Sequence, residues 1–362
     1  MPDDAAASAD AVLAQVRGAF PALPLHLDAA TAGLPAEAGR RAMHDAIDRW
    51  AAGDLDPLLH DEQLARSRHA AAALLGVPAS DVAAGTGASP FVALAVAAVP
   101  DGGTVLVADG EFTSVLFPVL SEARRRGLQV HSRPVEQLVE AVAADVDLVC
   151  VSAVQSADGR RIDLDALAAT AAAHDTLTLV DATQAAGWTT IDAGRFDMTV
   201  TGGYKWLCCP RGTAFATVRP SARERIPTLM ANWYAGENPW ASCYGTPLRQ
   251  AADARRYDLS PAWICWAGAA PALEAIAEAG PDVLGRHGIG LANDLRRRLG
   301  AGPAGSAIVA LRGDGIAEAL AAAGIRAAGR AGRTRISFHF WNDGTSVDAA
   351  LAALDGLAVE VA

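Results

Sequence analysis

The sequence contains very little lysine. Lysine and arginine together number 30, and lysine occurs only at position 205. A composition bias toward alanine and arginine explains why lysine is scarce, but not why the one lysine lies in "GGYKWLCCPRG", residues 202–212. This segment is therefore the first candidate for a functional site.

Cysteine is also scarce, and no two cysteines have the spacing of a metal site. The chain has 5 cysteines, an odd count, and none forms a C-x-x-C motif. This pattern indicates reduced thiols in a cytoplasmic protein rather than a disulfide framework or a zinc site, so we expect no bound metal. Cys208 and Cys209 follow the lysine in an apolar segment and are interpreted as packed thiols.

The chain lacks an excess of positive charge and a long apolar run. A net charge of -11 argues against nucleic acid or an anionic membrane as a partner. The longest apolar run, "FVALAVAAV", is too short to span a bilayer, and the acidic N-terminal segment has no apolar signal core. With 51% hydrophobic and 20% charged residues, the 362-residue chain is predicted to be globular and cytoplasmic, with a large core.

Short β-rich segments alternate with alanine-rich helical segments. The β-rich segments are residues 104–109, 146–154, 176–183 and 196–202. Repeated strand–helix–strand units predict an α/β fold with a mainly parallel sheet and helices on both faces. Residues 213–218 follow a short turn and are expected to form an antiparallel strand beside Lys205.

The pattern changes near residue 270. Helical segments follow, then a strand-like segment, "RISFHFW" (335–341), and a terminal helix. We interpret residues 1–24 as an N-terminal arm, residues 25–270 as a large domain and residues 271–362 as a small α+β domain.

Polar residues of the lysine segment and of the strand before it are expected at one edge of the sheet, where parallel sheets bind ligands. Lys205 follows two glycines, which allow a ligand to approach closely. A primary amine can form a Schiff base with a carbonyl, whereas a guanidinium cannot. Asp181 ends a strand and is placed to keep the ring nitrogen of pyridoxal phosphate (PLP) protonated. Gln184 is a candidate donor to the ring 3-oxygen and Thr183 a candidate cover for one ring face; the alternative for all three is a turn or a helix cap.

A glycine-rich turn, "GTGAS", precedes the helical segment that follows residue 89. The N–H groups of Gly87 and Ala88 are predicted to hold a phosphate at the positive end of the helix. Ser89 is the expected N-cap and Pro90 the expected first helical residue. The turn is neither a Walker loop nor a dinucleotide G-x-G-x-x-G motif.

In their order and spacing, these motifs resemble those of the class V aminotransferase family, fold-type I PLP enzymes that include cysteine desulfurases, kynureninase and isopenicillin N epimerase. The segments that carry the resemblance extend over nearly the whole chain: "LHLDAATAGLP", "GTGAS", "GEFTSVLFP", "VDATQAAG", "GGYKWLCCPRG", "RRYDLSPAW" and "RISFHFWND". The resemblance implies PLP as cofactor, a seven-stranded, mainly parallel sheet in the large domain, a small C-terminal α+β domain, and a homodimer.

The resemblance also implies cofactor contacts. Lys205 would carry the Schiff base, Asp181 the ring-nitrogen contact and Gln184 the contact with the 3-oxygen. Tyr204 matches a phosphate-binding position, whereas Gly202 falls where several relatives have a phosphate-binding serine.

Further residues correspond to the ring face, the partner subunit and the substrate. Phe112 falls where desulfurases stack a histidine on the ring, and phenylalanine can stack but cannot transfer protons. Ser260 would reach the phosphate of the partner subunit. Arg335 would pair with the substrate α-carboxylate, a bidentate contact suited to a guanidinium. In "NWYAGENPW" (232–240), Trp233 is the candidate substrate contact; its alternative is packing.

One departure from the family concerns the reaction. Desulfurases carry a nucleophilic cysteine on a loop before the arginine strand, whereas residues 321–337 are short and contain no cysteine. A C–S β-lyase needs no such nucleophile, because a cysteine-conjugate sulfoxide loses its sulfenate once Lys205 takes the Cα proton. The segments "KWLCCPRG" (205–212) and "WYAGENPWASCYG" (233–245) resemble the epimerase-like branch, which includes the ergothioneine C–S lyases.

We therefore expect a lyase that converts a substrate of the hercynylcysteine sulfoxide type to pyruvate, ammonia and a sulfur product. An aminotransferase, an epimerase or another lyase of biosynthetic metabolism remains an alternative, since these reactions share the first proton loss. A non-catalytic binding scaffold is a more remote alternative, and the missing glycine fingerprint disfavours a nicotinamide dehydrogenase.

Overall fold

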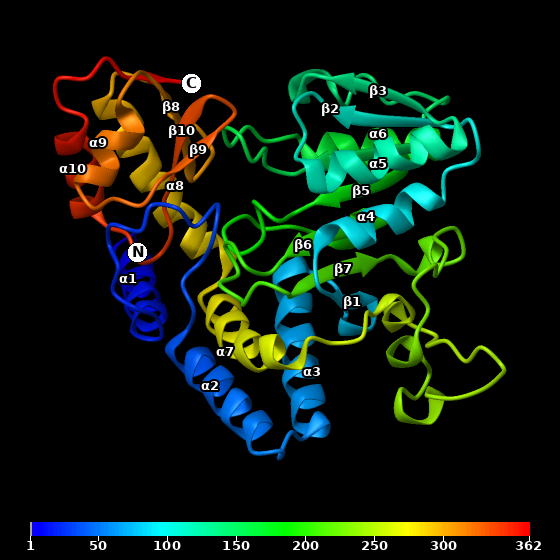
Figure 1. The fold of residues 1–362 in the computed structure, drawn as a ribbon. Coiled ribbons are helices and arrows are strands. Elements are labelled where there is room, and N and C mark those ends of the chain that lie inside the picture. The colour runs from blue at the N-terminus through cyan, green and yellow to red at the C-terminus, as the bar shows by residue number, and fades with distance from the viewer. Residues whose placement is uncertain (1) are drawn as a thin grey trace.

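The structure is a computed structural model that describes residues 2–362 and, from residue 9 onward, their side chains (Figure 1). Its main feature is a 7-stranded sheet in the order β1-β7-β6-β5-β4-β2-β3. The strands are β1 (Val82–Gly85), β2 (Thr104–Ala108), β3 (Gln129–Arg133), β4 (Leu148–Ser152), β5 (Leu177–Asp181), β6 (Met198–Gly202) and β7 (Ala214–Val218). β7 pairs antiparallel with both β1 and β6, and the other pairs are parallel, which confirms the predicted mainly parallel α/β sheet.

Helices cover both faces of this sheet, because its central strands are buried on both sides. In β5, Leu179 belongs to the core beneath α4 (Ala88–Ala97) and α5 (Thr113–Arg126). The next residue, Val180, belongs to the opposite core, beneath α3 (Pro57–Leu75), α6 (Leu164–His174) and α7 (Trp263–Ala279). The alternation of side chains along each strand thus divides the interior into two cores.

A second, 4-stranded antiparallel sheet lies in the C-terminal part of the chain, in the order β11-β8-β10-β9. Its strands are β8 (Ile308–Arg312), β9 (Ala328–Arg330), β10 (Arg333–Ser337) and β11 (Glu360–Val361). The other helices are α1 (Pro2–Gly18), α2 (Glu37–Ala51), α8 (Pro281–Arg298), α9 (Ile316–Ala322) and α10 (Gly344–Ala353). The predicted boundary at residue 270 lies within α7, and the limits of the domains remain a prediction. Among residues 2–362, no helix has the length and apolarity needed to cross a bilayer.

Two local predictions were wrong. The strand expected over residues 335–341 ends at Ser337. The Phe338 N–H still donates to the Ala307 carbonyl at 3.0 Å, but the two N–H groups after it bond to side chains: His339 N–H donates to Asn342 Oδ1 and Phe340 N–H to His339 Nδ1. Ser89 is not the N-cap of α4: the extended Gly87 takes that place and the helix begins at Ala88.

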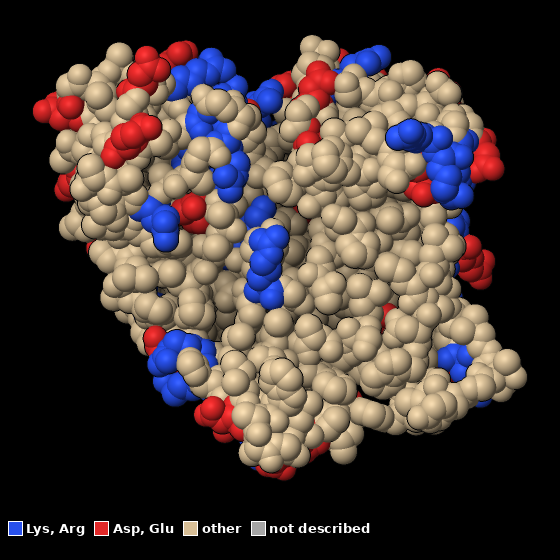
Figure 2. All heavy atoms as spheres, in the orientation of Figure 1, with Lys and Arg blue, Asp and Glu red and all other residues tan. Residues whose placement is uncertain are grey.

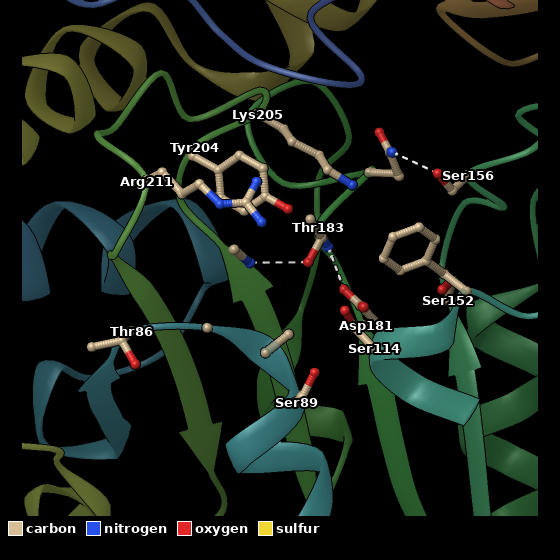
Figure 3. Close-up of a pocket in the computed structure, with 15 residues that line it drawn as sticks. Thr86, Ser89, Ser114, Ser152, Ser156, Asp181, Thr183, Tyr204, Lys205 and Arg211 are labelled. Carbon is tan, nitrogen blue, oxygen red and sulfur yellow. Dashed lines mark hydrogen bonds between the residues drawn. The ribbon is translucent and has the colours of Figure 1, made fainter. Parts of the chain in front are cut away.

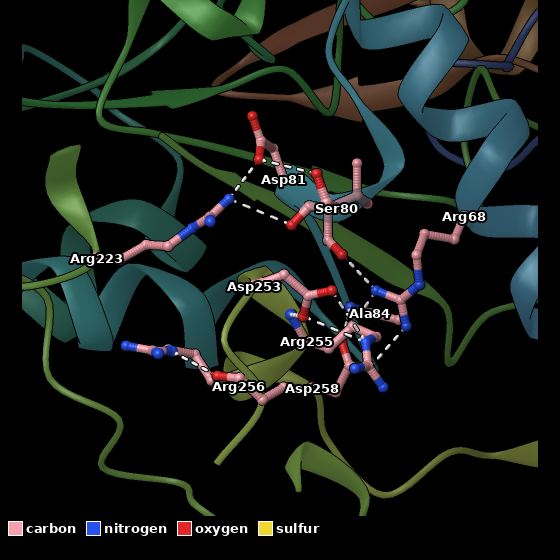
Figure 4. A network of polar contacts seen from close by, with 11 residues as sticks. Arg68, Ser80, Asp81, Ala84, Arg223, Asp253, Arg255, Arg256 and Asp258 are labelled. Atoms are coloured by element: carbon pink, nitrogen blue, oxygen red, sulfur yellow. Dashed lines mark hydrogen bonds and ion pairs between the residues drawn. The ribbon is translucent and has the colours of Figure 1, made fainter. Parts of the chain in front are cut away.

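A buried ion pair fixes the strand that leads into the glycine-rich turn (Figure 4). Arg68 of α3 contacts Asp258 at 2.7 Å and also donates to the carbonyl of Val82 in β1. Asp258 in turn accepts from the N–H of Ala84 at 2.7 Å. One carboxylate therefore joins α3, β1 and the segment that leads to Ser260.

Candidate active site

A cavity opens at the carboxyl edge of the 7-stranded sheet, where β5 and β6 end and α4 and α5 begin. The structure brings together in its lining many of the predicted residues: Gly87, Ala88, Phe112, Asp181, Thr183, Gln184, Tyr204 and Lys205. Lys205, Tyr204 and Asp181 are directed toward the same space, with Thr86 and Ser89 at its other end (Figure 3).

Lys205 lies beyond the end of β6 with only 6% of its surface exposed. Its Nζ atom is 5.1 Å from the centroid of the Phe112 ring and 5.8 Å from that of Tyr204. The glycine before Tyr204 is needed for packing against protein rather than for approach of a ligand, because a Cβ on Gly203 would lie 2.6 Å from Thr213 Oγ1. The turn therefore presents the amine to the cavity from a tightly packed backbone.

The charge environment of Lys205 favours its neutral form. Burial lowers the pKa of the Lys205 amine to about 8; the Asp181 carboxylate opposes this effect, and Arg335, Arg330 and Arg211 add to it. A neutral amine is the form that attacks a carbonyl or accepts a proton, so this site is suited to both tasks.

Asp181 ends β5 and is almost fully buried. Burial raises the pKa of its carboxyl group, while hydrogen bonding to Thr183 and the charge of Lys205 lower it. The Thr183 N–H donates to Asp181 Oδ1 at 2.7 Å, and Thr183 Oγ1 accepts from the Gly202 N–H at 2.9 Å. Within residues 9–362 Asp181 forms no ion pair, and a protonated ring nitrogen in the cavity would supply the missing cationic partner.

The Gln184 amide is already engaged in hydrogen bonds. Its Nε2 atom donates to the Ala30 carbonyl at 2.9 Å and to Ser156 Oγ at 3.1 Å, while its Oε1 atom accepts from Trp206 Nε1 at 2.7 Å. The predicted donation to a ring oxygen would therefore exchange the bond with Ser156.

The glycine-rich turn offers the donors that an anion needs. Gly87 and Ala88 line the cavity at the N-terminus of α4, and a Cβ on Gly87 would meet open space. Across the cavity, the Arg211 guanidinium lies 4.6 Å from the centroid of the Tyr204 ring. No ion pair engages Arg211 within the described part of the chain. Free helix N–H groups and an unpaired guanidinium fit a phosphate dianion.

Phe112 is held by a buried carboxylate that the sequence did not single out. Glu111 accepts from the Phe112 N–H at 2.7 Å and from the Ser152 N–H and Oγ at 2.8 and 2.6 Å. Gln155 Nε2 is a further donor at 3.2 Å. Glu111 therefore fixes the start of α5 to the end of β4 and sets the position of the Phe112 ring in the cavity.

Several lining residues lay outside the sequence prediction: Thr86, Ser114, Ser152, Ser156 and Arg211. Arg211 could have been found from the sequence, because it belongs to the lysine segment and lies two residues after Cys209. The serines could not have been found in this way, because isolated serines recur throughout the sequence and only the fold brings these to one cavity.

Arg335 does not line the cavity but lies directly behind it. It is 1% exposed and donates to the Ser156 carbonyl at 2.6 Å and to Thr31 Oγ1 at 2.7 Å. Asp28 Oδ1 lies 3.6 Å away and has no hydrogen bond, and Arg335 Nε also lacks a partner within residues 9–362. The arginine is thus held near the cavity with one donor unused.

Besides Arg335, the predicted residues Ser260 and Trp233 are not included in the cavity of a single chain. Ser260 is exposed and follows Leu259, whose N–H donates to the Ala84 carbonyl. Trp233 packs against Tyr234 and Trp240, with ring centroids 5.3 and 5.1 Å apart. Their predicted contacts with cofactor and substrate remain predictions.

The cysteines do not contribute to the cavity lining. Cys208 and Cys209 are free and buried, and burial raises the pKa of both thiols. This agrees with their interpretation as packed thiols, because a high thiol pKa leaves little reactive thiolate.

Comparison with known proteins gives three results. The family model for aminotransferase class-V matches residues 59–310. A kynureninase from Deinococcus radiodurans is 31% identical over 176 residues, which are 47% of this chain and 43% of that protein. The chain thus matches less than half the length of this curated relative.

Solved structures share the fold. The cysteine desulfurase CsdA from Escherichia coli superposes with a TM-score of 0.81 at 20% identity, over 95% of this chain and 97% of that one. The cystine C–S lyase C-DES, in complex with its product cysteine persulfide, gives a TM-score of 0.83 at 18% identity, over 93% and 98% of the two chains. A C-DES variant with glycine covalently linked to PLP gives a TM-score of 0.84 at 18% identity, over 94% and 99%.

The family match agrees with the residues that line the cavity. A buried amine, a buried carboxylate and an anion-binding turn meet at the strand ends where a cofactor with an aldehyde, a ring nitrogen and a phosphate would fit. Members of the matched family act on amino acids and are typically dimers. The chain therefore belongs to the class V aminotransferase family, has the fold of type I PLP enzymes, and is a PLP-dependent enzyme.

Proposed function

We propose that the protein is a C–S β-lyase that cleaves a cysteine-conjugate sulfoxide, with Lys205 as its catalytic residue. The observation that carries the proposal is the composition of the cavity: its lining within the described chain includes neither cysteine nor histidine, and Lys205 is its amine. Such a site has no thiol to take up sulfur, so a sulfur-containing substrate would have to carry a sulfur group that departs unaided.

The cofactor contacts are part of the same proposal. Lys205 would hold the cofactor aldehyde, Asp181 the ring nitrogen and Gln184 the 3-oxygen. Thr183 and Phe112 would cover the ring faces. The N–H groups of Gly87 and Ala88, the Tyr204 hydroxyl and the Arg211 guanidinium would hold the phosphate. When bound, PLP stabilises the negative charge that develops at Cα after proton loss.

The residues of the chain then divide the remaining work. Lys205 Nζ accepts the Cα proton, which its lowered pKa permits near neutral pH. The C–S bond breaks, and both of its electrons leave with the sulfenate. The three-carbon fragment is hydrolysed to pyruvate and ammonia. Arg335 orients the α-carboxylate through its unused donor, and Phe112 bounds the site without exchanging protons.

A homodimer completes the proposed site, with Ser260 of one subunit near the phosphate of the other and Trp233 at the substrate. Large apolar side chains that are exposed in the single chain support a partner surface: Ile47 and Trp50 on α2, Leu58 on α3, and Leu229, Tyr244 and Leu248 in the loop that follows β7. Sedimentation of the holoprotein tests this, and an active monomer would contradict it.

Product analysis tests the reaction. The PLP-loaded protein is incubated with hercynylcysteine sulfoxide and with S-ethylcysteine sulfoxide, and pyruvate is measured with lactate dehydrogenase. Pyruvate in one-to-one ratio with substrate consumed supports the proposal, and the Cys208→Ala variant should form it equally well. Alanine with a protein-bound persulfide, a keto acid that retains sulfur, or the inverted amino acid would identify another reaction.

The sequence match with a kynureninase favours one second candidate, cleavage of kynurenine. The same preparation is assayed with kynurenine, which contains no C–S bond. Consumption of kynurenine rather than of the sulfoxides would identify this second reaction.

A further inference from the structure

Two guanidinium groups meet at one hydroxyl beside the cavity. Arg330 at the end of β9 donates from Nη2 to Thr31 Oγ1 at 3.0 Å, and Arg335 of β10 donates from Nη2 to the same atom at 2.7 Å. Thr31 is a neutral side chain and cannot balance two positive charges. Like charges held this close favour an anion between or beside them.

The arginines of this hairpin differ in their partners. Arg333 pairs with Asp158 at 2.9 Å, and Arg335 has Asp28 at 3.6 Å. Arg330 has no carboxylate within ion-pair distance in the described chain; besides Thr31, it donates only to the carbonyl of the adjacent Gly329. Arg330 is thus the half-buried cation of the hairpin whose charge the protein leaves unbalanced.

Arg330 faces a second hollow that adjoins the first. This hollow is lined by Glu111, Phe112, Thr113, Ser156, Ala157 and Arg330, and it shares Phe112 and Ser156 with the cavity that holds Lys205. Glu111 accepts hydrogen bonds from Phe112 and Ser152, and within residues 9–362 it forms no ion pair with Arg330. Basic side chains are visible in the depression between the two sheets on the face shown in Figure 2.

We propose that Arg330 is a specificity residue that binds an anionic group on the distal part of the substrate, beyond the bond that breaks. This role of Arg330 rests on the lyase function proposed above. It assigns the substrate class as cysteine conjugates whose sulfur substituent carries a carboxylate. The α-amino end lies at Lys205, the sulfur substituent passes Phe112, and its carboxylate enters the second hollow.

Burial separates this role from that of Arg335. Arg335 is 1% exposed and lines neither hollow, whereas Arg330 lines the second hollow directly. The geometry therefore assigns the second hollow to Arg330 alone, and the contact of Arg335 with the α-carboxylate stays the separate proposal made above. The competing arrangement, in which both hold the α-carboxylate, predicts no preference for charge on the substituent.

The test compares two ligands of equal shape, the S-carboxyethyl and S-carbamoylethyl conjugates of α-methylcysteine. Both lack the Cα hydrogen, so their binding to the holoprotein does not depend on which reaction the enzyme performs. We expect titration calorimetry to show the carboxylate binding roughly 10- to 100-fold more tightly to the wild type, as for one charge-assisted contact. Arg330→Met should abolish this preference and leave the affinity for the carbamoyl ligand unchanged.

Arg326→Met is the matched control, since it removes the same charge from an exposed position just before β9 and should keep the preference. Arg330→Gln, which keeps a donor to Thr31, serves if the methionine variant does not fold. Equal binding of the two ligands to the wild type, absence of binding, or an equal loss for both ligands in the Arg330 variants would overturn the assignment. Failure of the lyase function would instead appear in the pyruvate assay, so the two failures are distinguishable.

Discussion

The buried amine of Lys205 should lower the stability of the protein when PLP is absent. Its pKa falls from 10.5 to about 8 on folding, which corresponds to about 3 kcal/mol of free energy. Below pH 8 the amine is protonated in both the folded and the unfolded state, so the full penalty of burying the charge applies. Between pH 8 and 10.5 only the unfolded chain holds the proton, and the free energy of unfolding should rise with pH.

Urea unfolding of the cofactor-free protein, wild type against Lys205→Met, measures this term. Methionine is similar in length and uncharged, so we expect the variant to be more stable than the wild type by about 3 kcal/mol at pH 7. The difference should shrink through pH 9 and nearly vanish by about pH 10.5. Titration of the groups that Lys205 does not influence is common to both proteins and cancels, whereas the pKa of Asp181 changes when the amine is removed. A difference that does not change with pH, or a wild type more stable at pH 7, would refute the argument.

Further predictions concern the site and its support. Lys205→Ala should abolish pyruvate formation even when cofactor remains bound; undiminished turnover would contradict the proposed role of the amine. Arg335→Ala should raise KM for the sulfoxide by an amount equivalent to about 2–5 kcal/mol with less effect on kcat, and an unchanged KM would remove its assignment to the α-carboxylate. Arg211→Met should weaken PLP binding, measured by equilibrium dialysis, while leaving the affinity for pyridoxal without phosphate unchanged. Arg68→Met should lower the free energy of unfolding by about 3–5 kcal/mol, because it leaves the Asp258 carboxylate buried without its partner; a thermal melt like that of the wild type would argue against this ion pair.

The sequence predicted best the residues that lie at strand ends. Asp181 and Lys205 each follow a run of buried strand residues, and parallel strands bring such ends to one edge of the sheet. The antiparallel strand β7 was also predicted correctly, because too few residues separate it from β6 for a crossover. In these cases the local pattern and the topology lead to the same position.

Residues whose roles depend on contacts between distant segments could not be found in this way. Glu111 and Ser152 bond across 41 positions of sequence, and Arg335 and Thr31 across 304. The start of α4 was misplaced because the serine that resembles a cap stands two positions after the glycine that adopts the extended conformation. A hydrogen bond to a side chain, as at His339, likewise ends a strand without a signal in its apolar pattern.

Because the sequence has one lysine, a label on lysine would report on a single site of the protein. The ε-amino group of Lys205 is buried at the cavity and is the one side-chain amine in the sequence. Lysine enriched with carbon-13 at its ε carbon would therefore yield a single resonance, and that resonance would report on the cavity without any need for assignment. Amine-directed labels would react only with this nitrogen and the α-amino terminus. The rate at which Lys205 reacts, relative to the terminus, would therefore measure how often the site opens.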